Sequence, residues 1–243
     1  MTDIEYLSVV LPALLAIFAS FVVSSSAGLG GSLFLVPSLA LLIGGKEGIA
    51  LAALLLAGNN VAKVLAYRQT LPFRKAAMVV VAVTIGAALG ASVLVAAPSS
   101  VVGVSIIVSI GASFLVERRE VAVMARVFSP VLAFAAGATS GFSGSSGPLK
   151  GIAIRNLRLD RRHFVGAASL ASLSGDAAKS LVFARESLLT QQSLVIFVAA
   201  VPIMAAGTLT GRRLNSRTGE VRFAALFWLV MSGYCVRLGL GAF

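Results

Sequence analysis

Two segments rich in glycine and serine contain the side chains of this chain that are best suited to binding chemistry. Residues 24–32 read Ser-Ser-Ser-Ala-Gly-Leu-Gly-Gly-Ser, and residues 139–147 read Thr-Ser-Gly-Phe-Ser-Gly-Ser-Ser-Gly. Serine hydroxyls donate hydrogen bonds without carrying charge, and glycine lets the backbone approach a ligand or adopt a positive φ. A helix that begins just after such a loop adds free N–H groups and a positive dipole end, which favour an anion. The alternative is that the small residues serve close helix packing.

Two lysines follow these segments at matching distances. Lys63 and Lys179 lie inside the ends of apolar segments, and Asn60 and Asp176 precede them by three residues. Ionisable groups inside membrane segments are costly and are functional candidates. The lysines could instead snorkel to the membrane surface, and Asp176 and Lys179 could form a structural i,i+3 ion pair. Asp176 is also the candidate for proton coupling, because it is the only acid within a predicted spanning segment.

These residues together make up a predicted anion site. The candidate substrate-binding residues are Ser25, Ser26, Gly28, Gly30, Gly31, Ser32, Asn59, Asn60, Lys63, Ser143, Gly144, Ser145, Ser146, Gly147 and Lys179. The sequence shows no Ser/His/Asp constellation, metal-ligand cluster or nucleotide-binding loop. It therefore predicts no catalytic residue, no metal and no cofactor, and the single cysteine, Cys235, excludes an internal disulfide.

The elements that must position these residues are hydrophobic enough to span a bilayer. Of the 243 residues, 58% are hydrophobic and 12% are charged. Most apolar runs reach the roughly 20 residues that cross the hydrocarbon core of a bilayer. The runs cover residues 6–24, 48–67, 76–97, 100–116, 127–142, 164–183, 191–210 and 221–236. The sequence therefore predicts an all-α polytopic membrane protein.

The chain repeats itself at an offset of 116 residues. Matching pairs include Phe18 and Phe134, Ser24 and Ser140, Gly28 and Gly144, Asn60 and Asp176, and Lys63 and Lys179. We expect two membrane repeats, residues 1–121 and 122–243. In each repeat, a re-entrant or half-length helical hairpin, broken by glycine and serine, precedes three transmembrane helices. The apolar arm 33–43 is only about 16 Å long as a helix, half of a membrane. Duplicated halves with interrupted short helices are typical of transporters that bind their substrate between the repeats.

The basic residues indicate how the two repeats are oriented. The net charge is +11, and most lysines and arginines gather in four short loops, near residues 68–75, 118–126, 155–162 and 212–217. The loops between them carry few charges. This pattern follows the positive-inside rule and gives no sign of nucleic-acid binding. An odd number of crossings in the first repeat then inverts the second repeat, with the N- and C-termini extracytoplasmic.

The motifs resemble those of the TauE/SafE family of sulfite and organosulfonate exporters. They are the glycine loop followed by a proline (Gly28 to Pro37), the small-polar helix with Asn59, Asn60 and Lys63, and the pair Gly86 and Gly90. All of them are repeated in the second half. The family usually has a further glycine where Ser32 stands. The resemblance implies transport of sulfite or a C2 sulfonate across the bacterial cytoplasmic (inner) membrane.

We therefore expect a secondary transporter, not an enzyme, that exports a small sulfur-containing anion such as sulfite or sulfoacetate by alternating access. An uptake permease for a carboxylate or another small anion is the alternative, and a non-transporting membrane accessory subunit is a third reading. The expected partners are the small anionic substrate and the lipid bilayer, with no nucleic acid. A homodimer is also compatible with the sequence.

Overall fold

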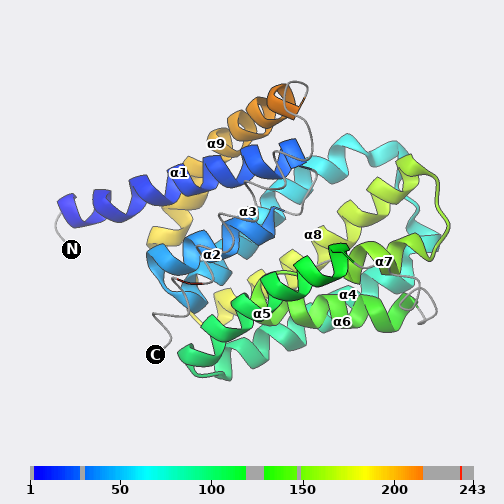
Figure 1. Ribbon diagram of the computed structural model, residues 1–243, viewed down its shortest axis with the longest axis horizontal. Helices are drawn as coiled ribbons and strands as arrows, with labels where there is room; N and C mark the ends of the chain where they lie inside the picture. Colours follow the sequence, from blue (N-terminus) through cyan, green and yellow to red (C-terminus); the bar gives the residue numbers. More distant parts are fainter. Residues whose placement is uncertain (1–2, 28–30, 119–128, 147–148, 216–235, 237–243) are drawn as a thin grey trace.

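The chain folds into helices, as the sequence predicts. The computed structural model describes residues 3–27, 31–118, 129–146, 149–215 and 236. These residues form nine α-helices and one 3-10 helix, with no strand among them (Figure 1). In chain order the helices are α1 (Asp3–Ala27), α2 (Ser32–Ile43), α3 (Gly45–Ala66), η1 (Arg68–Thr70), α4 (Phe73–Ala96), α5 (Ser99–Arg118), α6 (Ser129–Ser143), α7 (Leu149–Arg155), α8 (Arg161–Arg185) and α9 (Gln191–Asn215).

The predicted apolar runs lie on these helices wherever the structure describes them. The runs 6–24, 48–67, 76–97 and 100–116 correspond to α1, α3, α4 and α5, and the run 127–142 corresponds to α6. The runs 164–183 and 191–210 correspond to α8 and α9. The run 221–236, with Cys235, lies outside the described residues except for Val236. The predicted boundary between the repeats, near residue 121, also lies outside them.

Exposed apolar side chains identify the chain as a membrane protein. Three helices are long and apolar enough to cross a bilayer, over Gly45–Ala66, Phe73–Ala96 and Gln191–Gly211. On α4, large side chains that are at least half exposed recur every three or four residues, at Met78, Val81, Ile85, Leu89 and Val93. This spacing places them in one stripe along the helix. A stripe of this kind has no favourable contact with water and matches lipid chains.

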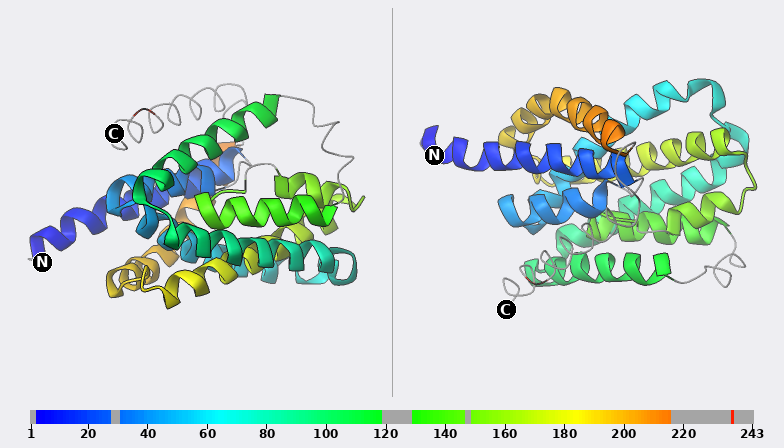
Figure 2. Two further views of the ribbon diagram at one scale, coloured as in Figure 1. Left: turned by 90° about the horizontal axis from the view of Figure 1, so that it is seen from below. Right: turned by 45° about the horizontal axis from the view of Figure 1, so that its top comes forward.

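Two pairs of helices approach each other closely through small residues. Helix α4 packs along α6, and α1 packs along α9 (Figure 1, Figure 2). A Cβ atom added at Gly86 or Gly90 of α4 would collide with the backbone of Phe134 or Ala138 on α6. The reverse holds on α6, where Gly137 and Gly141 face the backbone of α4, and on α9, where Gly207 and Gly211 face that of α1. The absence of side chains at these glycines lets the paired backbones come into contact.

The two short helices follow the two Gly/Ser segments. Helix α2 has 12 residues, about 18 Å of helix, and α7 has seven residues, about 10 Å. Both are therefore shorter than a bilayer crossing. Helix α2 is buried almost all round, with Leu33 and every residue from Leu35 to Ala40 in the interior. An apolar helix buried on all sides packs among other helices rather than against lipid.

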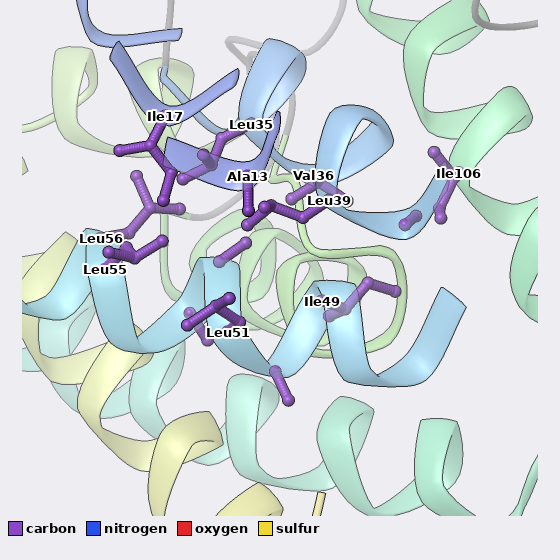
Figure 3. Close-up of a cluster of buried hydrophobic side chains, with 14 of the residues drawn as sticks. Ala13, Ile17, Leu35, Val36, Leu39, Ile49, Leu51, Leu55, Leu56 and Ile106 are labelled. Atoms are coloured by element: carbon purple, nitrogen blue, oxygen red, sulfur yellow. The ribbon is translucent and has the colours of Figure 1, made fainter. Parts of the chain in front are cut away.

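The interior contains two clusters of buried apolar side chains. The larger one brings α1, α2, α3 and α5 together, and Figure 3 shows part of it, with Ile17 of α1, Leu35 and Leu39 of α2, and Leu51 of α3. The smaller one joins α4, α6, α7 and α8 around Val79, Ala133, Ile154 and Ala171. Helix α8 thus packs against α3 and α4, and it carries the polar residues described next.

Candidate functional site

A buried ion pair forms the centre of the site. Lys179 and Asp176 lie one turn apart on α8, and Lys179 Nζ is 2.8 Å from Asp176 Oδ1. The two side chains are only 1% and 8% exposed. Removing two charges from water costs several kcal/mol for each ion, on the order of what their attraction returns, unless further hydrogen bonds satisfy the remaining polar atoms. The pair therefore depends on its neighbours.

Two polar side chains from other helices supply these hydrogen bonds. Asn60 of α3 donates from Nδ2 to Asp176 Oδ2 at 2.7 Å, and Lys179 Nζ donates to Ser140 Oγ of α6 at 3.0 Å. Asn60 and Asp176 are separated by 116 residues, the offset of the sequence repeat. The equivalent positions of the two halves therefore meet in the interior. The cluster joins α3, α6 and α8.

Lys63 occupies a different environment from its counterpart Lys179. It lies in the last turn of α3 and is exposed, whereas Lys179 is among the largest of the fully buried side chains. Its ammonium still lies within electrostatic range of the Asp176 carboxylate. The repeat therefore preserves the residue type at these two positions, while the structure buries one lysine beside a carboxylate and leaves the other exposed.

Lys150 is a member of the cluster that the sequence reasoning missed. It lies in the first turn of α7 and is half-buried, and its charge is within electrostatic range of Asp176, Lys179 and Lys63. The carboxylate of Asp176 thus has one lysine in direct contact and two more within electrostatic range. The available signal was a lysine three residues after the second Gly/Ser segment, but the matching position in the first half is Phe34, so the repeat did not point to it. Ser140 was likewise visible only as the counterpart of Ser24.

The two Gly/Ser segments lie next to each other in the folded chain. Ser32 Oγ, at the start of α2, is 3.4 Å from Ser145 Oγ in the segment after α6. Ser145 is buried, and Ser146 beside it is half-buried. Ser140, which accepts a hydrogen bond from Lys179, lies in the last turn of α6 and belongs to the same Gly/Ser segment as Ser145. The Ser32–Ser145 contact and the lysine cluster are therefore linked through α6.

One glycine of the predicted site has the backbone conformation that only glycine adopts readily. Gly144 is buried with φ of 78°, and a Cβ there would lie 2.7 Å from Val36 of α2. Gly31 has φ of −55°, which any residue can adopt. A Cβ at Gly31 would lie 3.2 Å from Ser24 Oγ, so close packing explains this glycine.

Two of the predicted serines use their hydroxyls within their own helices. Ser25 donates to the carbonyl of Phe21 at 2.6 Å, and Ser143 donates to that of Thr139 at 2.9 Å. Such bonds to the preceding turn are the usual local partners of helical serine. Asn59, half-buried on α3, precedes the cluster residue Asn60. Gly28, Gly30 and Gly147 lie outside the described residues, and Ser26 lies in the last turn of α1.

The site residues fit anion binding better than metal binding. Among the residues that the structure describes, no group of three histidine, cysteine, aspartate or glutamate side chains could hold a metal ion. The cluster instead presents ammonium groups, an amide and hydroxyls, which stabilise negative charge by hydrogen bonding and by their field.

Comparison with protein families assigns the chain. The family model described as "Sulfite exporter TauE/SafE" matches residues 13–238, nearly the whole length. Comparisons with curated proteins and with solved structures find no match. The matched range contains the lysine cluster and both Gly/Ser segments, and the family is one of membrane transporters rather than enzymes. The chain therefore belongs to the TauE/SafE sulfite exporter family.

Proposed function

We propose that this protein is a secondary transporter that exports a small sulfur-containing anion, sulfite or an organosulfonate such as sulfoacetate. The observation that carries the proposal is the buried cluster of Asp176, Lys179, Asn60 and Ser140, with Lys63 and Lys150 in range. Membership of the TauE/SafE family supports the sulfur-containing substrate. An ionisable cluster inside a membrane protein is the expected signature of a substrate or ion pathway.

The charges of the cluster favour an anion with two negative charges. The group contains three lysines and one carboxylate, so its formal charge is +2. Asp176 is within ion-pair distance of Lys179, whereas neither Lys63 nor Lys150 has an acidic side chain at that distance among the described residues. Sulfite and sulfoacetate can both carry two negative charges. We infer that Lys63 and Lys150 provide the attraction and that Ser32, Ser145 and Ser146 provide hydrogen bonds.

Alternating access would arise from motion of one repeat against the other. We propose that the second repeat is inverted in the membrane, with both termini outside the cytoplasm of a bacterial inner membrane. Helix pairing supports an arrangement with internal symmetry: α4 of the first half packs on α6, and α9 of the second half packs on α1. The contact between Asn60 and Asp176 then lies where equivalent positions of the repeats meet.

Asp176 is the proposed coupling residue. It is the only buried acidic residue in the described part of the chain, and its carboxylate contacts both halves through Asn60 and Lys179. Protonation would weaken both contacts, which links proton binding to the interface. Asp176→Asn should abolish proton-driven accumulation in proteoliposomes and preserve anion exchange. Equal loss of both activities would assign Asp176 to binding or structure instead.

The substrate is tested by binding and transport on the purified full-length protein. Ligands that bind the folded state raise the unfolding temperature, so sulfite, sulfoacetate, taurine, sulfate and a dicarboxylate can be compared directly. We expect sulfite or sulfoacetate to stabilise the protein and to exchange across proteoliposomes. Stabilisation by the dicarboxylate alone would overturn the sulfur-containing substrate and favour the carboxylate permease.

Matched variants connect the ligand to the cluster. Lys150→Gln should remove most of the stabilisation by the preferred anion, because it deletes one of the two lysines without a carboxylate partner. Arg68→Gln makes the same change of charge in the exposed helix η1, at a residue that is not part of the cluster, and should behave like the unmodified protein. Equal responses of the two variants would contradict a role for Lys150 in binding.

A further inference from the structure

A second basic site lies outside the lysine cluster. A cavity of about 630 Å³ opens between the segment that leads into α4 and the segment that joins α7 to α8. Its lining residues come from both halves of the sequence: Leu71, Pro72, Phe73, Arg74, Lys75, Arg158, Leu159, Asp160 and His163. It includes none of the residues assigned to anion transport above. Its function is therefore a separate question.

The charged part of this cavity is strongly positive. Arg74, Lys75 and Arg158 contribute three cations. The one acidic residue in the lining, Asp160, is already engaged: it accepts the backbone N–H of His163 at 2.9 Å and contacts His163 Nδ1 at 2.8 Å. It thereby caps the N-terminus of α8. The lining therefore contains three cations and one carboxylate that already bonds to His163. This balance of charge favours an anionic ligand, and arginine is well suited to phosphate.

The backbone at Arg158 shows that its position is enforced. Arg158 has φ of 50°, in the left-handed region that residues other than glycine adopt at a cost. The turn is closed by its own N–H, which donates to the carbonyl of Arg155 at 3.0 Å. This conformation places the arginine in the lining of the cavity.

The other wall of the cavity is apolar. Leu71, Pro72, Phe73 and Leu159 line it, and Phe73 is 63% exposed at the start of α4. The exposed apolar stripe of α4 begins about one turn further on, at Met78. The cavity therefore adjoins the surface that faces lipid. A free phosphate ion needs only the cations, whereas a phospholipid also uses an apolar wall for its glycerol and first methylene groups.

We propose that this cavity binds the phosphate headgroup of an anionic phospholipid. Arg74, Lys75 and Arg158 hold the phosphate, and the apolar wall holds the upper part of the lipid. Each lysine or arginine next to the membrane raises the affinity for anionic lipids about fivefold. The site lies in the loops that the positive-inside pattern places in the cytoplasm, so the lipid belongs to the inner leaflet.

Native mass spectrometry of the delipidated full-length protein tests the proposal. Phosphatidylglycerol and phosphatidylcholine are added separately in neutral detergent, and bound lipid is counted on the folded protein. We expect tight binding of phosphatidylglycerol only. Lys75→Gln and Arg158→Gln should each weaken it about fivefold, and the Arg74/Lys75/Arg158→Gln triple variant should abolish the preference. Arg68→Gln, in the adjoining segment but outside the lining, is the control.

A gain of binding provides a test that loss of folding cannot imitate. Asp160→Asn removes the negative charge of the lining and keeps a side chain that caps helices well. It should bind phosphatidylglycerol more tightly than the unmodified protein. The proposal is overturned if the triple variant keeps the preference for phosphatidylglycerol. It is also overturned if inorganic phosphate or glycerol 3-phosphate binds this site while phosphatidylglycerol does not. Transport of sulfite or sulfoacetate is measured separately, so failure of one proposal leaves the other in place.

Discussion

At the scale of single residues, the largest energetic cost of the site is the burial of two charges, on Asp176 and Lys179. Both groups are buried. Asp176 accepts a hydrogen bond from Asn60, and Lys179 donates one to Ser140. A pair of this kind contributes little to stability when it replaces well-packed apolar side chains, but removing one partner leaves an uncompensated charge in the interior. Removing one member of the pair should therefore destabilise the protein more than removing both.

This asymmetry gives a prediction for Lys179. Lys179→Gln should lower the free energy of unfolding by about 3–5 kcal/mol, because Asp176 remains buried without its cation. The double variant Asp176→Asn with Lys179→Gln should lose less than the single variant. Unfolding in detergent, followed by circular dichroism, measures both.

The repeat supplies the control for this prediction. Lys63→Gln removes the same group from the equivalent but exposed position, so we expect a loss of stability well below that of Lys179→Gln. If the double variant were destabilised, relative to the unmodified protein, by the sum of the effects of Asp176→Asn alone and Lys179→Gln alone, the two side chains would not be coupled in the folded protein.

At the scale of the helices, glycine decides how closely the two halves approach. Gly86 and Gly90 of α4 face the backbone of α6, and Gly137 and Gly141 of α6 face the backbone of α4. The contact is reciprocal, so each helix lies in the groove that the other leaves open. Helix α9 uses Gly207 and Gly211 on α1 in the same way. The contacts between α4 and α6 fix the position of α6, and with it the position of Ser140.

Adding one methyl group to this interface should therefore destabilise the protein. Gly90→Ala places a Cβ against the Ala138 carbonyl, so backbone rather than a flexible side chain must move. We expect the free energy of unfolding to fall by about 1–3 kcal/mol. Gly111→Ala on α5, where no atom lies within 4 Å of the added Cβ, is the matched control and should leave the unfolding temperature unchanged or slightly raised. Equal stability of the two variants would contradict the close contact of α4 and α6.

At the scale of the whole molecule, the charged loops predict its orientation. The segment from Arg68 to the first turn of α4 carries three basic residues, Arg68, Arg74 and Lys75, whereas the turn between α4 and α5 has no charged residue over 96–100. The positive-inside rule then places the first segment in the cytoplasm and the second outside. Inversion of the second repeat depends on this assignment together with an odd number of crossings in the first.

Cysteine labelling in intact cells measures this topology. With Cys235 replaced by serine, Ser99→Cys should react with a membrane-impermeant maleimide from outside. Arg68→Cys should react only after the membrane is permeabilised. A reporter fused after Phe243 should behave as extracytoplasmic. Labelling of both cysteines from the same side would rule out the proposed orientation, because α4 (Phe73–Ala96) separates them and is long enough to cross the bilayer.

Much of the fold could be predicted from the sequence because it depends on local composition. Apolar runs of membrane length, the two short arms after Gly/Ser segments and the pairing of Asp176 with Lys179 at i,i+3 all follow from hydropathy and helical spacing. The repeat also marked Asn60 and Asp176 as equivalent. The TauE/SafE resemblance rested on the same order of motifs, and the family match covers it.

The contents of the site required the tertiary structure, because contacts between helices depend on their crossing and rotation, which a linear sequence does not specify. Only the fold shows that Asn60 hydrogen-bonds Asp176, that Ser140 contacts Lys179, and that Lys150 approaches both charges. It also separates Lys63 from Lys179 by burial, although the repeat makes them equivalent. Sequence determined which residues are costly to bury, and tertiary packing decided which of them are buried together, since the partners that offset that cost come from other helices.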